Sequence, residues 1–304
     1  MPTVSVVLAT YNQAHWLGET IESVRAQTFA DWELVVADDG STDDTADVLA
    51  RFASDHRIRC VAGAHAERAA ARNRAIAAST GELVAFLDAD DTWHPEKLAR
   101  QVAVLAAAPE AGACYTVARF VDGSGRPFDV RKPPRAVSGL VFPRLVRGNF
   151  IILASMMVRR RCLEAVGTFD ATLPVFGCED WDLWLRLARR YAIVGIDEEL
   201  VRYRVHDGNT RAEQVMASGL AVLDRLYADP SVAREAGIGH AAARARHVWY
   251  HAGILAGRRR AAGLPLVAQA LREHPMTLWS RPAAGALAAV VLPRALEAAL
   301  RGRT

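Results

Sequence analysis

Three carboxylates stand close together in the sequence, in the run Asp88-Ala89-Asp90-Asp91. They follow the uncharged stretch at residues 83–87, whose apolar and aromatic side chains predict a buried strand. The acids would then lie on the loop that leaves this strand, where their mutual repulsion is costly without a cation. Hard oxygen ligands suit Mg²⁺ or Mn²⁺, which take one or two carboxylates and add water and substrate phosphates. The run therefore predicts a divalent-metal site, with capping of the helix after Pro95 as the alternative.

A second polar run, Asp38-Asp39-Gly40-Ser41-Thr42-Asp43, follows a short apolar stretch at residues 33–37. A carboxylate at the end of a strand can accept a hydrogen bond from a nucleobase imide or from a ribose hydroxyl. These residue types are also ordinary turn formers, and a turn with a helix cap is the better explanation when the run is taken alone. Its position beside other polar loops favours a binding role.

Both runs belong to a regular alternation of strand and helix patterns. Apolar stretches at residues 4–9, 33–37, 58–61 and 83–87 predict strands, and helical spacing separates them. The alternation indicates βαβ units, and hence an α/β fold with a mostly parallel, Rossmann-like sheet and helices on both faces. Ligands bind at the carboxyl ends of the strands in such sheets. These ends are here the polar loops 10–13, 38–41 and 88–92.

The pattern becomes less regular after Pro95. It predicts helices at 96–107 and 181–190, strands at 113–120, 151–158 and 199–205, and a long Gly-, Pro- and Arg-rich loop at 123–139. Beyond Arg211 the sequence is rich in Ala, Arg and Leu at helical spacing. We therefore expect a catalytic domain at residues 1–210 and a helical, Arg-rich C-terminal region at residues 211–304.

Five segments, taken in order, resemble glycosyltransferase family 2, whose members have the GT-A fold. They are Ser5 to Asn12, Val35 to Asp43, Ala71-Arg72-Asn73, Phe86 to Asp91 and Glu179 to Arg186. Their order over residues 3–208 is far more specific than any one of them. The resemblance implies an inverting transfer of a sugar from a nucleotide diphosphate donor to an acceptor hydroxyl. Uridine is the base that it favours, with thymidine and guanosine left open.

The resemblance also implies which residues bind the donor nucleotide. Thr10, Tyr11 and Asp39 match the positions around the base and nucleoside. Arg72 matches a helix position near the nucleotide, and Asp88 matches part of the ribose-diphosphate motif.

A metal site is implied in the same way. Asp88 and Asp90 match the metal motif, and His206 resembles an additional metal or diphosphate contact, with an ordinary loop histidine as the alternative. Mn²⁺ or Mg²⁺ is the expected cofactor, because a bound cation neutralises the charge that develops on a departing diphosphate.

Sugar transfer also needs a base, because an acceptor hydroxyl is a poor nucleophile. Asp180 matches the general base of the family. An acidic first turn that complements the dipole of the following helix is the other interpretation of Glu179 and Asp180. Trp181 is expected in the core rather than against an acceptor sugar.

The composition is that of a well-packed soluble protein, with 51% hydrophobic and 23% charged residues among 304. No apolar run reaches the roughly 20 residues that a membrane-spanning helix needs. The N-terminus shows no secretory signal pattern, so a cytoplasmic location is expected. The four cysteines are widely spaced and predict neither a zinc site nor a disulfide.

The net charge of +3 combines two unlike parts. Residues 231–304 hold 11 Arg and 3 Glu without Lys or Asp, giving +8 and leaving −5 for residues 1–230. An acidic N-terminal part makes nucleic acid an unexpected partner. Basic charge and the apolar stretch at 283–292 predict peripheral contact of residues 280–304 with the inner face of a membrane, with packing on the catalytic domain as the alternative. A glycan, a lipid-linked glycan of cell-surface polysaccharide or glycoconjugate synthesis, and a small molecule remain open as acceptors.

Two other functions fit parts of the sequence. Residues 88–92 also match the Asp-x-Asp-x-Thr signature of haloacid-dehalogenase-type phosphatases, with Asp88 as nucleophile and Asp90 as general acid. Those enzymes usually carry the motif on their first strand and need a later lysine, whereas three strands precede it here and only Lys97 and Lys132 are present. A non-catalytic scaffold of the same fold is the second alternative, against which the intact acidic residues argue.

Overall fold

The computed structural model describes residues 1–128, 135–173, 177–206, 208, 212–258, 260–275, 282–284 and 286–287. The chain divides into two compact units. The first comprises Met1–Val141, Phe150–Ala171 and Asp182–Asn209, and the second comprises Phe142–Asn149, Thr172–Trp181 and Thr210–Thr304. The division of the chain at residue 210 stays a prediction, and the second unit takes up residues 142–149 and 172–181 as well as the C-terminal part.

The first unit is built on one eight-stranded sheet with the order β3-β2-β1-β4-β7-β6-β8-β5. Strands β3, β2, β1 and β4 are parallel, β7 is antiparallel to both of its neighbours, β8 is parallel to β6, and β5 is antiparallel to β8. The α/β class is confirmed, with the parallel order confined to the first four strands and to the β6–β8 pair. The strands are β1 Val4–Thr10, β2 Trp32–Asp38, β3 Ile58–Ala62, β4 Leu83–Asp88, β5 Thr92–Trp93, β6 Ala113–Val121, β7 Met156–Arg159 and β8 Ile193–Arg204.

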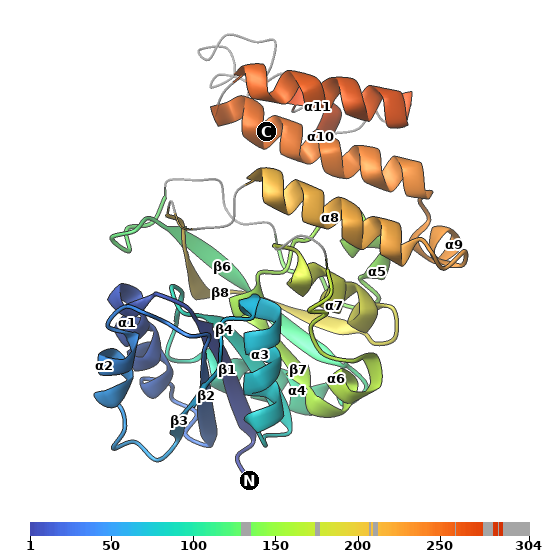
Figure 1. The fold of residues 1–304 in the computed structure, drawn as a ribbon. Coiled ribbons are helices and arrows are strands. Elements are labelled where there is room, and N and C mark those ends of the chain that lie inside the picture. Colours follow the sequence, from blue (N-terminus) through green and yellow to red (C-terminus); the bar gives the residue numbers. More distant parts are fainter. Residues whose placement is uncertain are drawn as a thin grey trace. The chain divides into compact units, whose positions relative to one another are not determined.

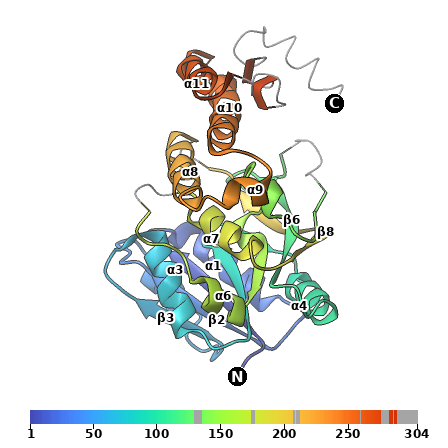
Figure 2. The same ribbon diagram turned by 90° about the vertical axis from the view of Figure 1, so that its right-hand side faces the viewer.

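Helices cover both faces of this sheet. Alternate side chains of the strands point to opposite faces, so Val4, Val6 and Leu8 of β1 join one core with α1 (Ala14–Arg25), α2 (Thr45–Ala50) and α4 (Lys97–Ala107). On the other face, α3 (Glu67–Ala78) packs on β1 and β2. Figure 1 shows α3 in front of these strands, and Figure 2 shows α3 and α4 on opposite sides of the sheet.

Several elements differ from the sequence-based expectation. The strand predicted at 151–158 begins only at Met156, because Leu153–Ser155 forms a 3₁₀ turn whose Ala154 carbonyl accepts a hydrogen bond from the Trp93 indole. A buried apolar run alone does not distinguish these conformations. The strand expected at 199–205 starts six residues earlier, at Ile193. Helix α6 (Arg160–Val166) was not predicted, and α7 spans Glu179–Ala188.

The second unit is helical in its described part, as predicted for the C-terminal region. Its helices are α5 Phe142–Leu145, α8 Ala212–Leu226, α9 Val232–Ala236, α10 His240–Arg258 and α11 Arg260–Glu273. Helix α10 lies between α8 and α11 and forms a small core of its own around Trp249 (Figure 1). Within the described residues no helix is both long and apolar enough to cross a membrane. Most of the segment 280–304, with its predicted membrane contact, lies outside the described residues.

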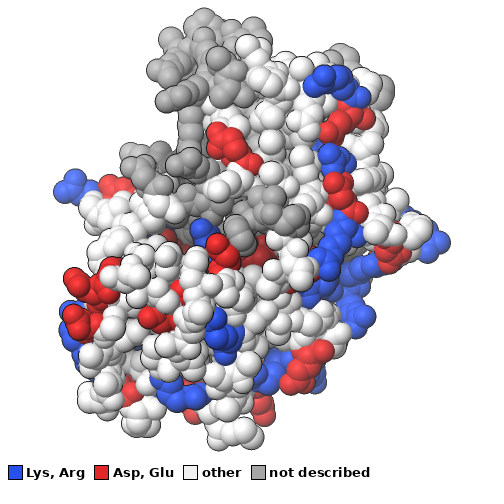
Figure 3. All heavy atoms as spheres, in the orientation of Figure 1, with Lys and Arg blue, Asp and Glu red and all other residues white. Residues whose placement is uncertain are grey.

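Charges of both signs are interspersed on this helical unit. Arg244 of α10 pairs with Asp224 of α8 and, at 3.5 Å, with Glu273 of α11. Figure 3 shows acidic and basic side chains alternating on the face that it presents. Part of the positive charge of the C-terminal region is therefore neutralised locally.

One buried carboxylate ties the N-terminal ends of the parallel strands together. Oε1 of Glu33 on β2 accepts hydrogen bonds from the hydroxyl of Ser5 at 2.7 Å and from the backbone N–H of Thr80 at 2.6 Å, and Oε2 pairs with Arg59 at 2.8 Å. Burial by itself raises the pKa of Glu33, but these hydrogen bonds outweigh it and lower the pKa from 4.5 to about 2. The ionised form is therefore part of the folded structure.

We predict that Glu33→Gln lowers the free energy of unfolding by about 2 kcal/mol at neutral pH, because the donors lose a charged partner. The pKa of Glu33 is lower in the folded than in the unfolded state, so this stabilisation is present above about pH 4.5 and is lost as the pH falls through about 2. Urea denaturation at pH 7 and pH 3 measures it, with Glu22→Gln on the exposed side of α1 as control. If Glu33→Gln lowered the free energy of unfolding equally at pH 7 and pH 3, Glu33 would not be the ionised, low-pKa group described here.

Candidate functional site

The three polar loops predicted from the sequence meet at one edge of the sheet. In the parallel register, Thr10 at the end of β1 is paired with Asp38 of β2, and Ala9 is paired with Asp88 of β4. The loops that follow these strands therefore start side by side. Asn12, which has a left-handed φ of 52°, links two of them, because its side-chain oxygen accepts the N–H of Thr42 at 2.7 Å.

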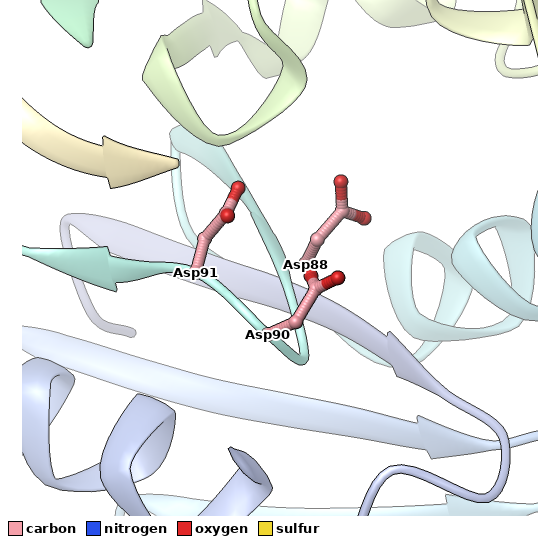
Figure 4. A group of neighbouring side chains, drawn as sticks. All are labelled: Asp88, Asp90 and Asp91. Carbon is pink, nitrogen blue, oxygen red and sulfur yellow. The ribbon is translucent and has the colours of Figure 1, made fainter. Parts of the chain in front are cut away.

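The acidic loop after β4 brings three carboxylates together. Asp88, Asp90 and Asp91 each offer an oxygen atom that lies within 4.8 Å of the others, and Figure 4 shows the three side chains leaving the same loop. Asp91 is completely buried, whereas the side chains of Asp88 and Asp90 are 27% and 16% exposed. The predicted juxtaposition of Asp88 and Asp90 is thus present, and Asp91 joins it.

Hydrogen bonds from distant elements hold this loop in place. The Thr20 hydroxyl of α1 lies 2.8 Å from the carbonyl of Ala89 and 2.9 Å from that of Asp91. At the end of β8, the backbone N–H of Arg204 donates to Oδ1 of Asp91, and its Nε donates to the carbonyl of Asp90, both at 2.9 Å. The positions of the acids are therefore set by residues more than 60 positions away along the chain.

Basic side chains face two of the acids. Arg72 of α3 donates to Oδ1 of Asp88 at 2.7 Å, and Nε2 of His206 lies 2.8 Å from Oδ2 of Asp90. Burial raises the pKa of Asp90, and the charge of Asp88 raises it further. Burial also raises the pKa of Asp91 well above its ordinary value, with the charges of Asp90 and Asp88 adding to the effect. The fully ionised cluster would therefore be stabilised by positive charge beyond that of the Arg72 and Arg204 guanidinium groups.

The donor atoms present fit a divalent cation. Oδ2 of Asp91 is buried and accepts no hydrogen bond from the part of the chain that the structure describes. Carboxylate oxygens and an imidazole nitrogen are suitable ligands for Mn²⁺, and carboxylates for Mg²⁺. Asp88, Asp90 and His206, the predicted metal residues, lie together, and each could contribute a ligand.

Tyr11 and Asp39 form a second cluster on the neighbouring loops. The Tyr11 ring is 42% exposed, and it stacks on His65 with ring centroids 4.1 Å apart. The buried Asp39 carboxylate accepts hydrogen bonds from Arg74 at 2.8 Å and from the backbone N–H of Ala66 at 3.1 Å. An exposed aromatic ring beside a carboxylate can stack and hydrogen-bond a heterocyclic base.

Thr10, predicted beside the nucleotide, is buried at the end of β1. Its hydroxyl oxygen has no hydrogen-bond partner among the described residues. The hydroxyl is therefore a polar group at this edge of the sheet that a ligand or water could satisfy.

Arg72 is held by a residue that the sequence-based reasoning did not single out. Its guanidinium lies 5.4 Å from the centre of the Phe169 ring. The Asn73 side chain donates to the carbonyl of Phe169 at 2.8 Å and accepts its N–H at 3.0 Å. The Ala-Arg-Asn motif therefore supplies both a cation and the clamp that fixes the segment stacked on it.

Asp180 belongs to the second unit, at the start of α7. Its Oδ2 accepts a hydrogen bond from the Asn149 side chain at 3.0 Å, and its Oδ1 accepts the N–H of Trp181 at 2.7 Å. Both oxygens of the predicted base are thus oriented by the chain.

Trp181 is a core residue, 1% exposed, as expected from its spacing. Its indole N–H donates to the carbonyl of Leu145 at 2.9 Å, and its ring stacks on His247 of α10 with centroids 5.3 Å apart. Burial lowers the pKa of His247 from 6.5 to about 3, so this imidazole is neutral at physiological pH. Helix α10 therefore helps to fix the position of Trp181, the residue that directly follows Asp180.

The family model for "Glycosyl transferase family 2" matches residues 5–167, which include the three loops and the Ala-Arg-Asn motif. This chain belongs to glycosyltransferase family 2. The matched range covers more than half of the chain and contains four of the five segments, so the predicted resemblance is confirmed.

Proteins with sequences similar to this chain are also named as glycosyltransferases. An uncharacterized glycosyltransferase of Nostoc, alr2836, is 34% identical over 228 residues, which are 71% of this chain and 68% of the relative. The Escherichia coli UDP-Glc:α-D-GlcNAc-diphosphoundecaprenol β-1,3-glucosyltransferase WfaP is 29% identical over 219 residues, 70% of this chain and 82% of its own.

A solved structure confirms the GT-A fold. The mannosyltransferase PcManGT of Pyrobaculum calidifontis, in complex with GDP-Man and Mn²⁺, superimposes with a TM-score of 0.61 at 22% identity. The match covers 95% of this chain and 86% of that one. At this identity the likeness shows the fold alone.

The phosphatase alternative needs a lysine, and the environment of Lys97 argues against that role. Lys97, one of the two lysines of the chain, is fully buried, with Nζ 2.7 Å from the side-chain oxygen of Gln101 and 3.8 Å from the centre of the Trp93 ring. Burial lowers its pKa to about 7. Its side-chain nitrogen is thus engaged in the core at the start of α4, and Lys132 lies outside the described residues.

Several residues of the site carried no signal that sequence reasoning used. Arg204 is the last residue of β8 and stands two positions before the predicted His206, but its sequence position alone did not mark it as a site residue. Thr20 and Asn149 gave no such signal, because each acts through a contact with a segment far away in the sequence.

We predict that Gly219→Ala destabilises the helical unit. A Cβ at Gly219 on α8 would lie 2.3 Å from Cε1 and Nε2 of His247 and 3.1 Å from the Trp181 ring. Because that histidine is buried, we expect a loss of about 1–3 kcal/mol despite the better helix propensity of alanine. Thermal denaturation checks it, with Gly239→Ala as matched control, since nothing lies within 4 Å of a Cβ there. An unchanged melting temperature for Gly219→Ala would show that His247 is not packed as described.

Proposed function

We propose that this chain is an inverting, metal-dependent glycosyltransferase that moves a sugar from a nucleotide diphosphate donor, with UDP as the first choice, to an acceptor hydroxyl. The observation that carries the proposal is the cluster of Asp88, Asp90 and Asp91 beside Tyr11 and Asp39 at one edge of the sheet. The clustered carboxylates would be neutralised by a divalent cation, which in turn would bind the diphosphate. The exposed Tyr11 ring beside them could stack on the base of the same nucleotide.

In this proposal the donor nucleotide is held by two neighbouring loops and the acidic cluster. Tyr11 stacks on the base, Asp39 accepts its N–H, and Thr10 lies at the end of the same strand. Asp88 and Asp90, with His206 beside them, hold Mn²⁺ or Mg²⁺, and Arg72 keeps positive charge next to Asp88. The bound cation would neutralise the charge that develops on the leaving nucleotide diphosphate.

Asp180 acts on the acceptor in the proposed mechanism. Its carboxylate takes the proton of the acceptor hydroxyl as that oxygen bonds to the anomeric carbon, and the bond from this carbon to the phosphate oxygen breaks. Asn149 donates to Oδ2 of Asp180 and so fixes the orientation of the carboxylate. Attack opposite to the leaving group inverts the anomeric configuration.

We take the acceptor to be a lipid-linked glycan of polysaccharide synthesis, because the relative WfaP is named for a diphosphoundecaprenol-linked acceptor and UDP-Glc. An acceptor of this kind would place the enzyme at the inner face of a membrane. Contact through residues 280–304 is part of this proposal.

Metal-dependent nucleotide binding tests the donor site. We expect UDP with Mn²⁺ to stabilise the wild-type protein by about 2.7 kcal/mol at 100 times its Kd, and EDTA to remove the effect. Asp90→Ala loses the stabilisation because the cation loses a ligand, whereas Asp47→Ala, an exposed acid on α2, keeps it. Thermal-shift measurements with UDP, TDP, GDP and CDP read this out. Equal stabilisation with EDTA, or none by any nucleotide, would remove the basis of the proposal.

Substitution of the proposed base separates chemistry from binding. We expect Asp180→Asn to lower kcat by about 10²- to 10⁴-fold while the Kd for UDP and Mn²⁺ stays unchanged. UDP release from UDP-sugars, with a GlcNAc-diphospholipid as acceptor, measures turnover, and NMR of the product gives the anomeric configuration. Asp182→Asn, two residues along α7, is the control and keeps turnover. Retention of configuration, or full activity of Asp180→Asn, would be incompatible with this mechanism.

A further inference from the structure

His65 contacts both residues, Tyr11 and Asp39, that the proposed function assigns to binding of the donor base. Its ring stacks on Tyr11, with ring centroids 4.1 Å apart and planes inclined by 22°. Its Nδ1 lies 2.8 Å from Oδ2 of Asp39. Because an ionised carboxylate only accepts hydrogen bonds, Nδ1 carries the proton in this contact. One side chain therefore brings a flat ring to Tyr11 and an N–H to Asp39, the two features that a nucleobase would bring.

The spacing leaves no room for both His65 and a base on this face of Tyr11. Ring centroids 4.1 Å apart correspond to stacked rings in van der Waals contact, so a third ring does not fit between them. Asp39 is 2% exposed, and its other donors, Arg74 and the Ala66 N–H, come from the chain itself. A base that uses this face and this carboxylate oxygen must therefore displace His65.

The segment that carries His65 is strained. Glu67, the first residue of α3, has a φ of 69°, in the left-handed region that residues with a Cβ rarely adopt. The Ala66 N–H lies 3.1 Å from both carboxylate oxygens of Asp39, and Nε2 of His65 lies 3.6 Å from Oε1 of Glu67. The contacts of His65 with Asp39 and Glu67 thus lie directly beside this strained residue.

We infer that His65 is a specificity-determining residue of the donor site, which stands in for the base until a donor displaces it. The inference rests on the proposed function, since it takes Tyr11 and Asp39 as the base contacts. Displacement removes one N–H donor from a buried carboxylate, and the incoming base must replace it to avoid the cost of an unsatisfied acceptor. Uracil, thymine and guanine carry a ring N–H that can take the place of the Nδ1–H of His65 at Asp39, whereas the corresponding ring nitrogen of cytosine bears a lone pair at neutral pH and only its exocyclic amino group donates. The site therefore selects UDP, TDP or GDP over CDP.

Isothermal titration calorimetry with UDP in the presence of Mn²⁺ tests the inference. We expect His65→Ala to lower the Kd about 3- to 10-fold, because the competing side chain is gone. His65→Phe keeps a ring that competes for Tyr11 but has no donor for Asp39, so its Kd falls less. His56→Ala, at an exposed histidine before β3, leaves the Kd unchanged. In the wild-type protein CDP binds about 10-fold more weakly than UDP.

The outcomes separate this inference from the proposed function. If wild type binds UDP and both His65→Ala and His65→Phe, shown to be folded by thermal denaturation, bind it with an equal or higher Kd, His65 is no competitor and the inference is overturned. Equal affinity of the wild-type protein for CDP and UDP overturns the inferred preference for bases with a ring N–H. If neither the wild-type protein nor any variant binds any of the four nucleotides with Mn²⁺, the proposed function fails, and the inference fails with it.

Discussion

Repulsion among Asp88, Asp90 and Asp91 is the constraint on which the rest of the site depends. Burial raises the pKa of Asp90 and of Asp91, and the charges of the neighbouring carboxylates raise it further, so the loop needs positive charge and hydrogen-bond donors from outside itself. Arg72 of α3 supplies charge, His206 after β8 contacts Asp90, and Arg204 and Thr20 supply hydrogen-bond donors. The packing of α1, α3 and the end of β8 around β4 can be understood as the means by which these groups reach the loop. A divalent cation would complete the neutralisation.

Local patterns predicted much of the fold. The predicted ends of strands β1 to β4 and of helix α4 lie within one or two residues of the observed ends, because each is a strongly periodic or uniformly apolar run between polar turns. The antiparallel β7 and the early start of β8 could not be predicted in the same way. Both are fixed by pairing with β6, whose residues lie far away in the sequence, and such long-range pairing leaves no local periodicity.

The candidate site was predictable to a similar extent. The residues on strand ends, such as Asp39 and Asp88, were found because parallel strands bring their carboxyl ends to one edge. Residues that act by holding others were given no role from the sequence: Asn73 entered only as part of the Ala71-Arg72-Asn73 segment, and Asn149 was not singled out. Their function is visible only in the contacts with Phe169 and Asp180, which sequence spacing does not encode.

The C-terminal helices α8 and α10 pack around Trp181. This residue directly follows Asp180, is buried, and stacks on the neutral His247 of α10 against Gly219 of α8. Removal of the C-terminal helices would thus expose the residue next to the proposed base. The region outside the family match is therefore part of the framework that presents Asp180, whatever further contacts its Arg-rich segment makes.

The central claim is that the acidic loop after β4 holds a divalent cation. Anomalous diffraction at the manganese absorption edge, from crystals of the protein grown with MnCl₂ and UDP, tests it most directly. We expect a strong anomalous peak about 2.2 Å from a carboxylate oxygen of Asp90, with UDP phosphate oxygens completing the coordination. A structure with UDP bound and no anomalous peak at Asp88, Asp90 or Asp91, or with the peak elsewhere in the molecule, would contradict it.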